Sequence, residues 1–366
     1  TKLVKPVFDS FVTRELATFF AVNLCTGISV LLGSSSVCAD QVRLARPISE
    51  NLLQESGQRF HPVHSSLGIV SSQERLASEV GAFMLRKGGN AMDAAVATAF
   101  ALSVTLPQAG NLGGGGFLVF WHAPERKAYA LNFREMAPHL AHRDLFLGAD
   151  GEVSKNKEFF SLLSTGVPGS VAGLLKAQER FGRLSRVEVM APSIQLADEG
   201  FVIYPQLADS LKRAFSRLSK DPTARSLFYR QVELPDGGPQ WIPYQSGEQL
   251  RQPELAQSLK LISSKGTAGF YEGTTAHQIV ALMKSQGGLI DYRDLTDFTA
   301  PWGEPVKGIF RDHTVISMPP PSSGGLTLLQ ILKLIEPFDF ESLGTNSADS
   351  IHLLTESMNL AYRDRN

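Results

Sequence analysis

The sequence of 366 residues has few cysteines and almost no excess charge. Its only two cysteines are Cys25 and Cys38, and its 35 basic residues nearly balance 36 acidic ones, which gives a net charge of −1 at pH 7. A chain so close to neutral lacks the basic surface typical of nucleic-acid-binding proteins, so no nucleic-acid partner is expected. Because the chain after Cys38 contains no cysteine, core burial and not disulfides must stabilise that part.

Motifs for metal binding and for internal repeats are also missing. The eight histidines are scattered and form neither an HExxH nor an HxH pair, so we expect no metal site and no cofactor. The sequence has no repeat, no low-complexity tract and no proline–serine linker. A single α+β domain is therefore the simplest interpretation.

The first 39 residues have the order of features that is typical of a secretory signal. Three basic residues precede an apolar stretch at 17–32, and small side chains up to Ala39 match a signal-peptidase site. A membrane anchor or a buried helix fits less well, because polar residues interrupt the stretch and it is shorter than the roughly 20 apolar residues of a membrane span. We predict a signal peptide at 1–39 and a periplasmic or secreted chain at 40–366.

Apolar spacing and glycine stops predict helices along most of the chain. A helix is expected at 74–87, and a second, alanine-rich helix should follow the N-cap Asn90 and lie buried in the core. Aromatic and branched residues predict two strands that form an antiparallel hairpin, 117–121 and 128–133. Residues 205–260 are expected to form a helical excursion with loops. The remaining elements are helices at 170–181, 187–199, 275–286, 326–335 and 348–363, and a strand at 313–317.

Four consecutive glycines at 113–116 have two interpretations. The backbone N–H groups of a glycine-rich loop can bind a phosphate. A nucleotide-binding loop, however, lies between a strand and the helix that follows it, and it carries Lys and Ser or Thr at fixed positions. These glycines precede a strand and lack those residues. Close backbone packing is therefore the favoured interpretation.

Arg134 is the strongest single candidate for a binding residue. It stands where the second strand of the hairpin ends, and a guanidinium there could hold a carboxylate through two parallel hydrogen bonds. The alternative is a structural pair with Glu135 or another acid, and the residues alone slightly favour that alternative.

Two hydroxyl pairs could be mistaken for nucleophiles. A serine nucleophile needs a base, and no histidine of the sequence stands in a motif that suggests this role for Ser322 or Ser323. We therefore favour the interpretation that these serines cap the helix at 326–335. Thr274 and Thr275 stand before a predicted helix and have no visible partner.

Several long motifs, taken together, closely resemble the γ-glutamyltransferase family. They occur in the family's order over roughly residues 60–365, and the resemblance is weakest at 205–260. The motifs are Gly89–Val96, Pro107–Gly116, Asn132–Pro138, Thr165–Gly173 and Ser317–Gly325.

This resemblance implies an α+β N-terminal-nucleophile hydrolase, a four-layer αββα sandwich completed by a separate small subunit of the same precursor. In the family, the nucleophile is the threonine that begins the small subunit. It attacks a γ-glutamyl amide such as glutathione and passes the acyl group to water, an amino acid or a peptide. The sequence stops at Asn366 before any such threonine, so we expect no catalytic nucleophile in this chain.

The resemblance also assigns Arg134 to the α-carboxylate of the γ-glutamyl donor, and it places the family's substrate-binding serine pair in the small subunit. Two alternatives stay open. One is a related acylase of the cephalosporin or polyglutamate type. The other is a periplasmic amino-acid or peptide-binding protein, which should bind its ligand as an isolated chain, whereas an enzyme subunit should not.

Overall fold

Helix caps define the first two helices of the computed structural model, which describes residues 64–234, 237–344 and 346–365. The predicted signal peptide at 1–39 lies outside these residues. Helix α1 (Arg75–Arg86) begins at Glu74, whose carboxylate accepts the N–H groups of its first turn. Helix α2 (Ala91–Thr105) begins at a reciprocal capping box.

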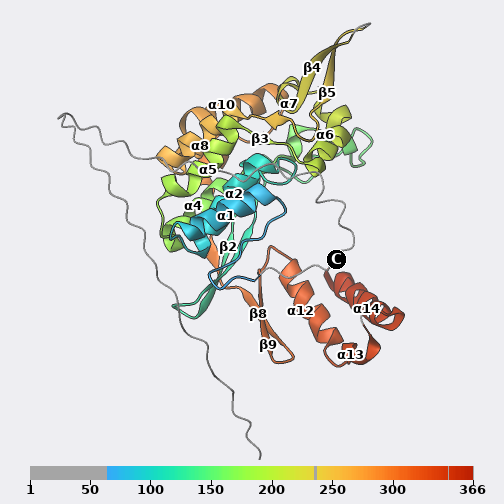
Figure 1. The fold of residues 1–366 in the computed structure, drawn as a ribbon. Coiled ribbons are helices and arrows are strands. Elements are labelled where there is room, and N and C mark those ends of the chain that lie inside the picture. Colours follow the sequence, from blue (N-terminus) through green and yellow to red (C-terminus); the bar gives the residue numbers. More distant parts are fainter. Residues whose placement is uncertain (1–63, 235–236, 345, 366) are drawn as a thin grey trace, which may run out of the picture. The chain divides into compact units, whose positions relative to one another are not determined.

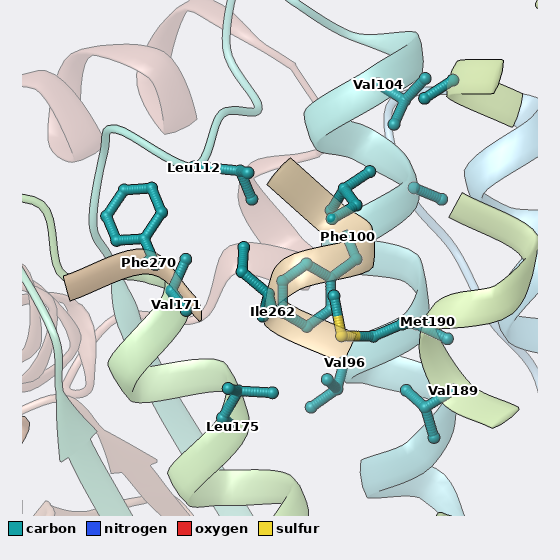
Figure 2. Packing of buried hydrophobic residues seen from close by; sticks show 14 of the residues in the cluster. Val96, Phe100, Val104, Leu112, Val171, Leu175, Val189, Met190, Ile262 and Phe270 are labelled. Carbon is teal, nitrogen blue, oxygen red and sulfur yellow. The ribbon is translucent and has the colours of Figure 1, made fainter. Parts of the chain in front are cut away.

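Helix α2 lies at the centre of the hydrophobic core. Its small residues let three helices approach it, namely α1, α4 (Ser170–Phe181) and α5 (Arg186–Glu199) (Figure 1). Phe100 of α2 is fully buried, and its ring points toward Met190 of α5 and Ile262 of α8 (Pro253–Lys265) (Figure 2). The predicted buried position of the alanine-rich helix is confirmed.

The predicted hairpin is formed by β1 (Phe117–His122) and β2 (Lys127–Asn132), which pair antiparallel in the register Phe117 to Asn132. A two-residue strand, β7 (Trp302–Gly303), pairs with the other edge of β2. Helix α4 packs against β2, and four of the six residues of β2 are buried. The core therefore fixes the strand that leads directly to Arg134.

The last part of the chain consists of a hairpin and three helices. Strands β8 (Val306–Phe310) and β9 (His313–Ser317) pair antiparallel. Helix α12 (Gly324–Ile335) lies against both strands and against α14 (Ala348–Arg365), which also contacts the short helix α13 (Phe340–Leu343).

Residues 205–260 differ from the expected helical excursion, because they also contain an antiparallel hairpin of β4 (Tyr229–Leu234) and β5 (Gly238–Pro243). Its strands carry charged and amide side chains and prolines without clean alternation, so the sequence pattern did not indicate it. The elements between α2 and β8 not yet described are α3 (Lys155–Phe159), η2 (Leu162–Ser164), β3 (Phe201–Val202), α6 (Pro205–Leu218), α7 (Pro222–Phe228), β6 (Gln249–Leu250), α9 (Ala268–Tyr271), α10 (Gly273–Gln286) and α11 (Tyr292–Asp297).

The mixture of a helical core with antiparallel strands confirms the predicted α+β class. Within the described ranges, no helix has both the length and the hydrophobicity that a membrane span requires.

Candidate active site

Arg134 follows the last residue of β2 by two positions and is exposed. Its backbone N–H donates to Oδ1 of Asn132 at 3.1 Å. Among residues 64–234, 237–344 and 346–365, no carboxylate lies within 4.0 Å of its guanidinium. The structural pair with Glu135 is therefore not formed there, and the guanidinium fork is available to a ligand.

Gly115 and Gly116 hold the beginning of residues 133–140, which we call the Arg134 loop. Gly116 and Phe133 exchange two backbone hydrogen bonds, of 3.2 and 3.0 Å. A Cβ at Gly115 would lie 2.7 Å from the backbone nitrogen of Glu135 and would also collide with the carbonyl oxygen of Phe133. The glycines thus serve close backbone packing, as predicted, and only residues without a side chain let the loop approach so closely.

A second glycine-rich segment receives the side chain of Phe133. The ring of Phe133 occupies the space that a Cβ at Gly173 would fill. Further along the loop, Met136 and Val167 form an antiparallel bridge with hydrogen bonds of 3.4 and 2.7 Å. The motif Thr165–Gly173 therefore acts as the packing surface of the Arg134 loop.

A cavity of about 540 Å³ opens beside Arg134. This volume lies within the range of small-molecule sites. The sequence indicated Arg134 but not the lining residues Thr299 and Pro301, because these lie more than 150 positions further along the chain. The cavity is lined by Asn132, Arg134, Glu135, Met136, Thr299, Pro301 and Pro321.

The far end of the Arg134 loop meets α11 through His139. The backbone N–H of His139 and its ring Nδ1 both lie at hydrogen-bond distance from Oδ1 of Asp294, at 2.8 and 3.1 Å. Burial is the largest influence on the pKa of Asp294 and would raise it, but the bonds from His139 and from the Asp291 backbone together hold that pKa below its ordinary value.

These residues also form the group whose geometry comes nearest to a metal site in the described part of the chain. One ligand atom each from His139, Asp291 and Asp294 lies within 4.8 Å of the others. The oxygens of Asp294 already accept hydrogen bonds from His139 and from the Asp291 backbone. The three residues therefore form a hydrogen-bonded group, and no sequence spacing indicated it.

One residue of each hydroxyl pair has a structural role. Oγ of Ser322 accepts the N–H of Gly324 at 3.3 Å, whereas the N-cap residue Ser323 makes no side-chain cap bond. The predicted cap of this helix therefore comes from Ser322 alone. Thr275 lies inside α10 and not before it, is buried, and donates its hydroxyl to the Gly269 carbonyl at 2.9 Å.

Comparison with known proteins agrees with this geometry. The family model described as gamma-glutamyltranspeptidase matches residues 77–366. A crystal structure of Helicobacter pylori gamma-glutamyltranspeptidase is similar with a TM-score of 0.78 and 39% identity, over 83% of this chain and 85% of that chain. The fold is thus that of the γ-glutamyltranspeptidases and related N-terminal-nucleophile hydrolases.

Two curated relatives support the same assignment. The glutathione hydrolase proenzyme of Escherichia coli (strain K12) is 40% identical over 339 residues, which cover 92% of this chain and 56% of the relative. The Acylase ACY 1 proenzyme of Pseudomonas sp. (strain V22) is 36% identical over 310 residues, 83% of this chain and 54% of that relative. The chain spans about half the length of these curated relatives. It belongs to the γ-glutamyltranspeptidase family.

Proposed function

We propose that this chain is the large subunit of a γ-glutamyltransferase/glutathione hydrolase. It would supply part of the donor site, while the nucleophilic threonine would come from a small subunit cut from the same precursor. The observation that carries this proposal is the exposed guanidinium of Arg134 beside a cavity of about 540 Å³, in a chain of this family.

In this proposal, the Arg134 fork binds the α-carboxylate of a γ-glutamyl donor such as glutathione. A bidentate contact fixes orientation as well as position, so it would aim the γ-amide at the small-subunit threonine. The hydroxyl oxygen attacks the amide carbon and its proton passes to the threonine α-amine. The C–N bond then breaks, the leaving amine takes the proton, and an ester to the enzyme remains. Water or the amine of an amino acid or peptide cleaves that ester.

Chain lengths support a two-chain enzyme. The match covers 56% of the E. coli proenzyme, but it covers 85% of a chain in the H. pylori structure. A chain of about this size therefore exists as a separate polypeptide in a solved relative, and proenzyme names fit a precursor that is cut.

Exposed apolar side chains support a partner surface on this chain. Strand β1 has no neighbour on its outer edge among the described strands, and its Val119 and Trp121 are exposed. Leu326 and Leu328 of α12 are exposed as well. Apolar surface and an open strand edge are features that a second chain can cover, so we assign the small subunit to these faces.

Purification of the complete precursor provides the test. Mass spectrometry and N-terminal sequencing should find two polypeptides, one of them starting with threonine, and the preparation should cleave a chromogenic γ-glutamyl anilide. A single uncut polypeptide with no γ-glutamyl activity would contradict the proposal. A lone chain of residues 40–366 that binds amino acids or peptides would favour the binding-protein alternative instead.

Location in the periplasm or outside the cell is part of the same proposal and rests on the order of residues in 1–39. Sequencing of the exported protein should find a start near Asp40. An exported chain that still begins at Thr1 would contradict the signal peptide.

An acylase with another substrate is the second candidate, because the Acylase ACY 1 proenzyme is 36% identical to this chain. The two activities differ in what Arg134 must bind. A γ-glutamyl donor carries a free α-carboxylate that the guanidinium can bind. Measuring the turnover of γ-glutamyl amides and of cephalosporin-type amides by the same preparation therefore distinguishes the two activities.

A further inference from the structure

The Arg134 loop is tied to the rest of the chain at three places. Upstream, the backbone of Phe133 pairs with Gly116, and in the middle Met136 pairs with Val167. Downstream, the backbone and the side chain of His139 both contact Asp294. Arg134 lies between the first and second ties, and the third tie holds the downstream end of the same loop.

The third tie joins the Arg134 loop to a distant segment that also lines the cavity. Asp294 is on α11, which ends at Asp297, two positions before the lining residue Thr299. The carbonyl of Pro301, another lining residue, accepts the backbone N–H of Asn132 at 3.0 Å. The contact between His139 and Asp294 therefore closes a loop of chain, 132–139 with 294–301, that carries six of the seven residues lining the cavity.

The imidazole has a defined place in this tie. Nδ1 lies 3.1 Å from Oδ1 of Asp294, whose side chain is 5% exposed, whereas Nε2 lies 3.6 Å from Oδ2 of Asp291. The first distance allows a hydrogen bond and the second does not. The backbone N–H of His139 donates to the same Asp294 oxygen, so replacing the ring removes one of two bonds and leaves the chain path in place.

We infer that His139 is a positioning residue. Its ring bond to Asp294 holds the Arg134 loop against α11 and so keeps the guanidinium in place beside the other residues that line the cavity. This inference rests on the proposed function, because the consequence of a loose loop is weaker binding of the donor carboxylate.

The test uses the complete, processed enzyme and three variants. His139→Ala removes the ring and keeps the backbone bond. His139→Asn restores a side-chain N–H at the position of Nδ1. His142→Ala, in the same segment, is the matched control because His142 is exposed and its side chain makes no hydrogen bond with other residues of the described part.

We expect His139→Ala to raise KM for a γ-glutamyl donor about 3- to 10-fold with kcat within twofold, because a loosened contact weakens substrate positioning. His139→Asn should recover most of the loss, and His142→Ala should behave as wild type. For a donor that lacks the α-carboxylate, wild type and His139→Ala should have the same kcat/KM, because that donor makes no use of Arg134.

Three results would overturn the inference. One is an unchanged KM in His139→Ala and His139→Asn with an active wild type, which would leave the proposed function intact. The second is equal loss for donors with and without the α-carboxylate, which would indicate a general structural role. The third is wild-type activity that rises with Zn²⁺ and falls with EDTA while His139→Ala does not respond, which would indicate a metal site. A wild type without γ-glutamyl activity would instead overturn the proposed function and this inference together.

Discussion

Helices α2 and α12 are about equally apolar, yet they are buried to very different extents. Eleven of the fifteen residues of α2 are buried, against two of the twelve in α12. Helix α2 lies against α1, α4 and α5, whereas the main neighbours of α12 among the described elements are α14 and the β8–β9 hairpin. Since apolar surface is stabilising only when it leaves water, the core around α2 can support itself and the part around α12 needs further cover.

The cavity depends on both parts. Arg134 extends from a strand that the core holds, and Pro321 of the same cavity comes from the turn before α12. A partner chain that covers α12 would therefore act directly on one side of the site. Under the proposed two-chain organisation, the core around α2 would stay stable while a second chain completes the site.

The largest expected effect is on the core. Phe100→Ala should lower the free energy of unfolding by about 3–5 kcal/mol, because it leaves a cavity that packed neighbours cannot fill. Phe338→Ala, in the C-terminal part, is the matched control: Phe338 is 47% exposed, so less than about 1 kcal/mol is expected there. Urea titration of both variants in the complete enzyme measures the difference. Equal losses would contradict the contrast between the two parts.

The next effect concerns Arg134. Both Arg134→Ala and Arg134→Lys should lower kcat/KM for γ-glutamyl donors by an amount that corresponds to about 1.5–3 kcal/mol, since lysine keeps the charge but loses the fork. Precursor cleavage should continue, because it requires the threonine and not the donor carboxylate. The comparison uses a donor without its α-carboxylate, against which wild type should discriminate strongly and Arg134→Ala far less. Equal discrimination would return Arg134 to a structural role.

A smaller effect is expected on the exposed face of α12. Expressed without the rest of the precursor, the chain should aggregate, and replacing Leu326 and Leu328 by glutamine should reduce that aggregation. In the complete precursor, the same two substitutions should weaken the association of this chain with the proposed small subunit. Full burial of a leucine is worth about 1.5–3 kcal/mol, so these partly exposed leucines should each contribute roughly half of that amount.

The control for this face is Leu282→Gln on α10, because Leu282 is 47% exposed but lies outside the C-terminal part. Light scattering of the lone chain and size-exclusion chromatography of the assembled enzyme measure the two effects. A lone wild-type chain that is monomeric and unfolds cooperatively would contradict the need for cover.

The smallest expected effect is the acid sensitivity of the Asp294 contact. The pKa of Asp294 is held below its ordinary value in the folded chain. The group therefore contributes stability that is fully present above the ordinary Asp pKa of about 3.9 and is lost as pH falls through the folded pKa. Between pH 5 and pH 2, Asp294→Asn should lose less stability than wild type in urea titrations. Parallel curves would indicate that Asp294 contributes nothing to this dependence.

Local features could be predicted from the sequence because they depend on neighbouring residues. Glu74 and Asn90 begin helices through their own side chains, and the β1–β2 hairpin follows from two short apolar runs and a polar turn. The end of β2 then places Arg134, and the family motifs indicate its role. The hairpin of β4 and β5 could not be predicted because its polar strands lack an alternating pattern.

From the residues alone, the long helices outside 205–265, the first hairpin, the close packing of the glycines and the place of Arg134 at a strand end could be inferred. The folded chain was needed to show which of two similar apolar helices is buried, that Thr299 and Arg134 line one cavity, and that His139 meets Asp294 over a separation of 155 residues. Caps, turns and periodicity act over a few residues, whereas burial and contact depend on which distant segments pack together.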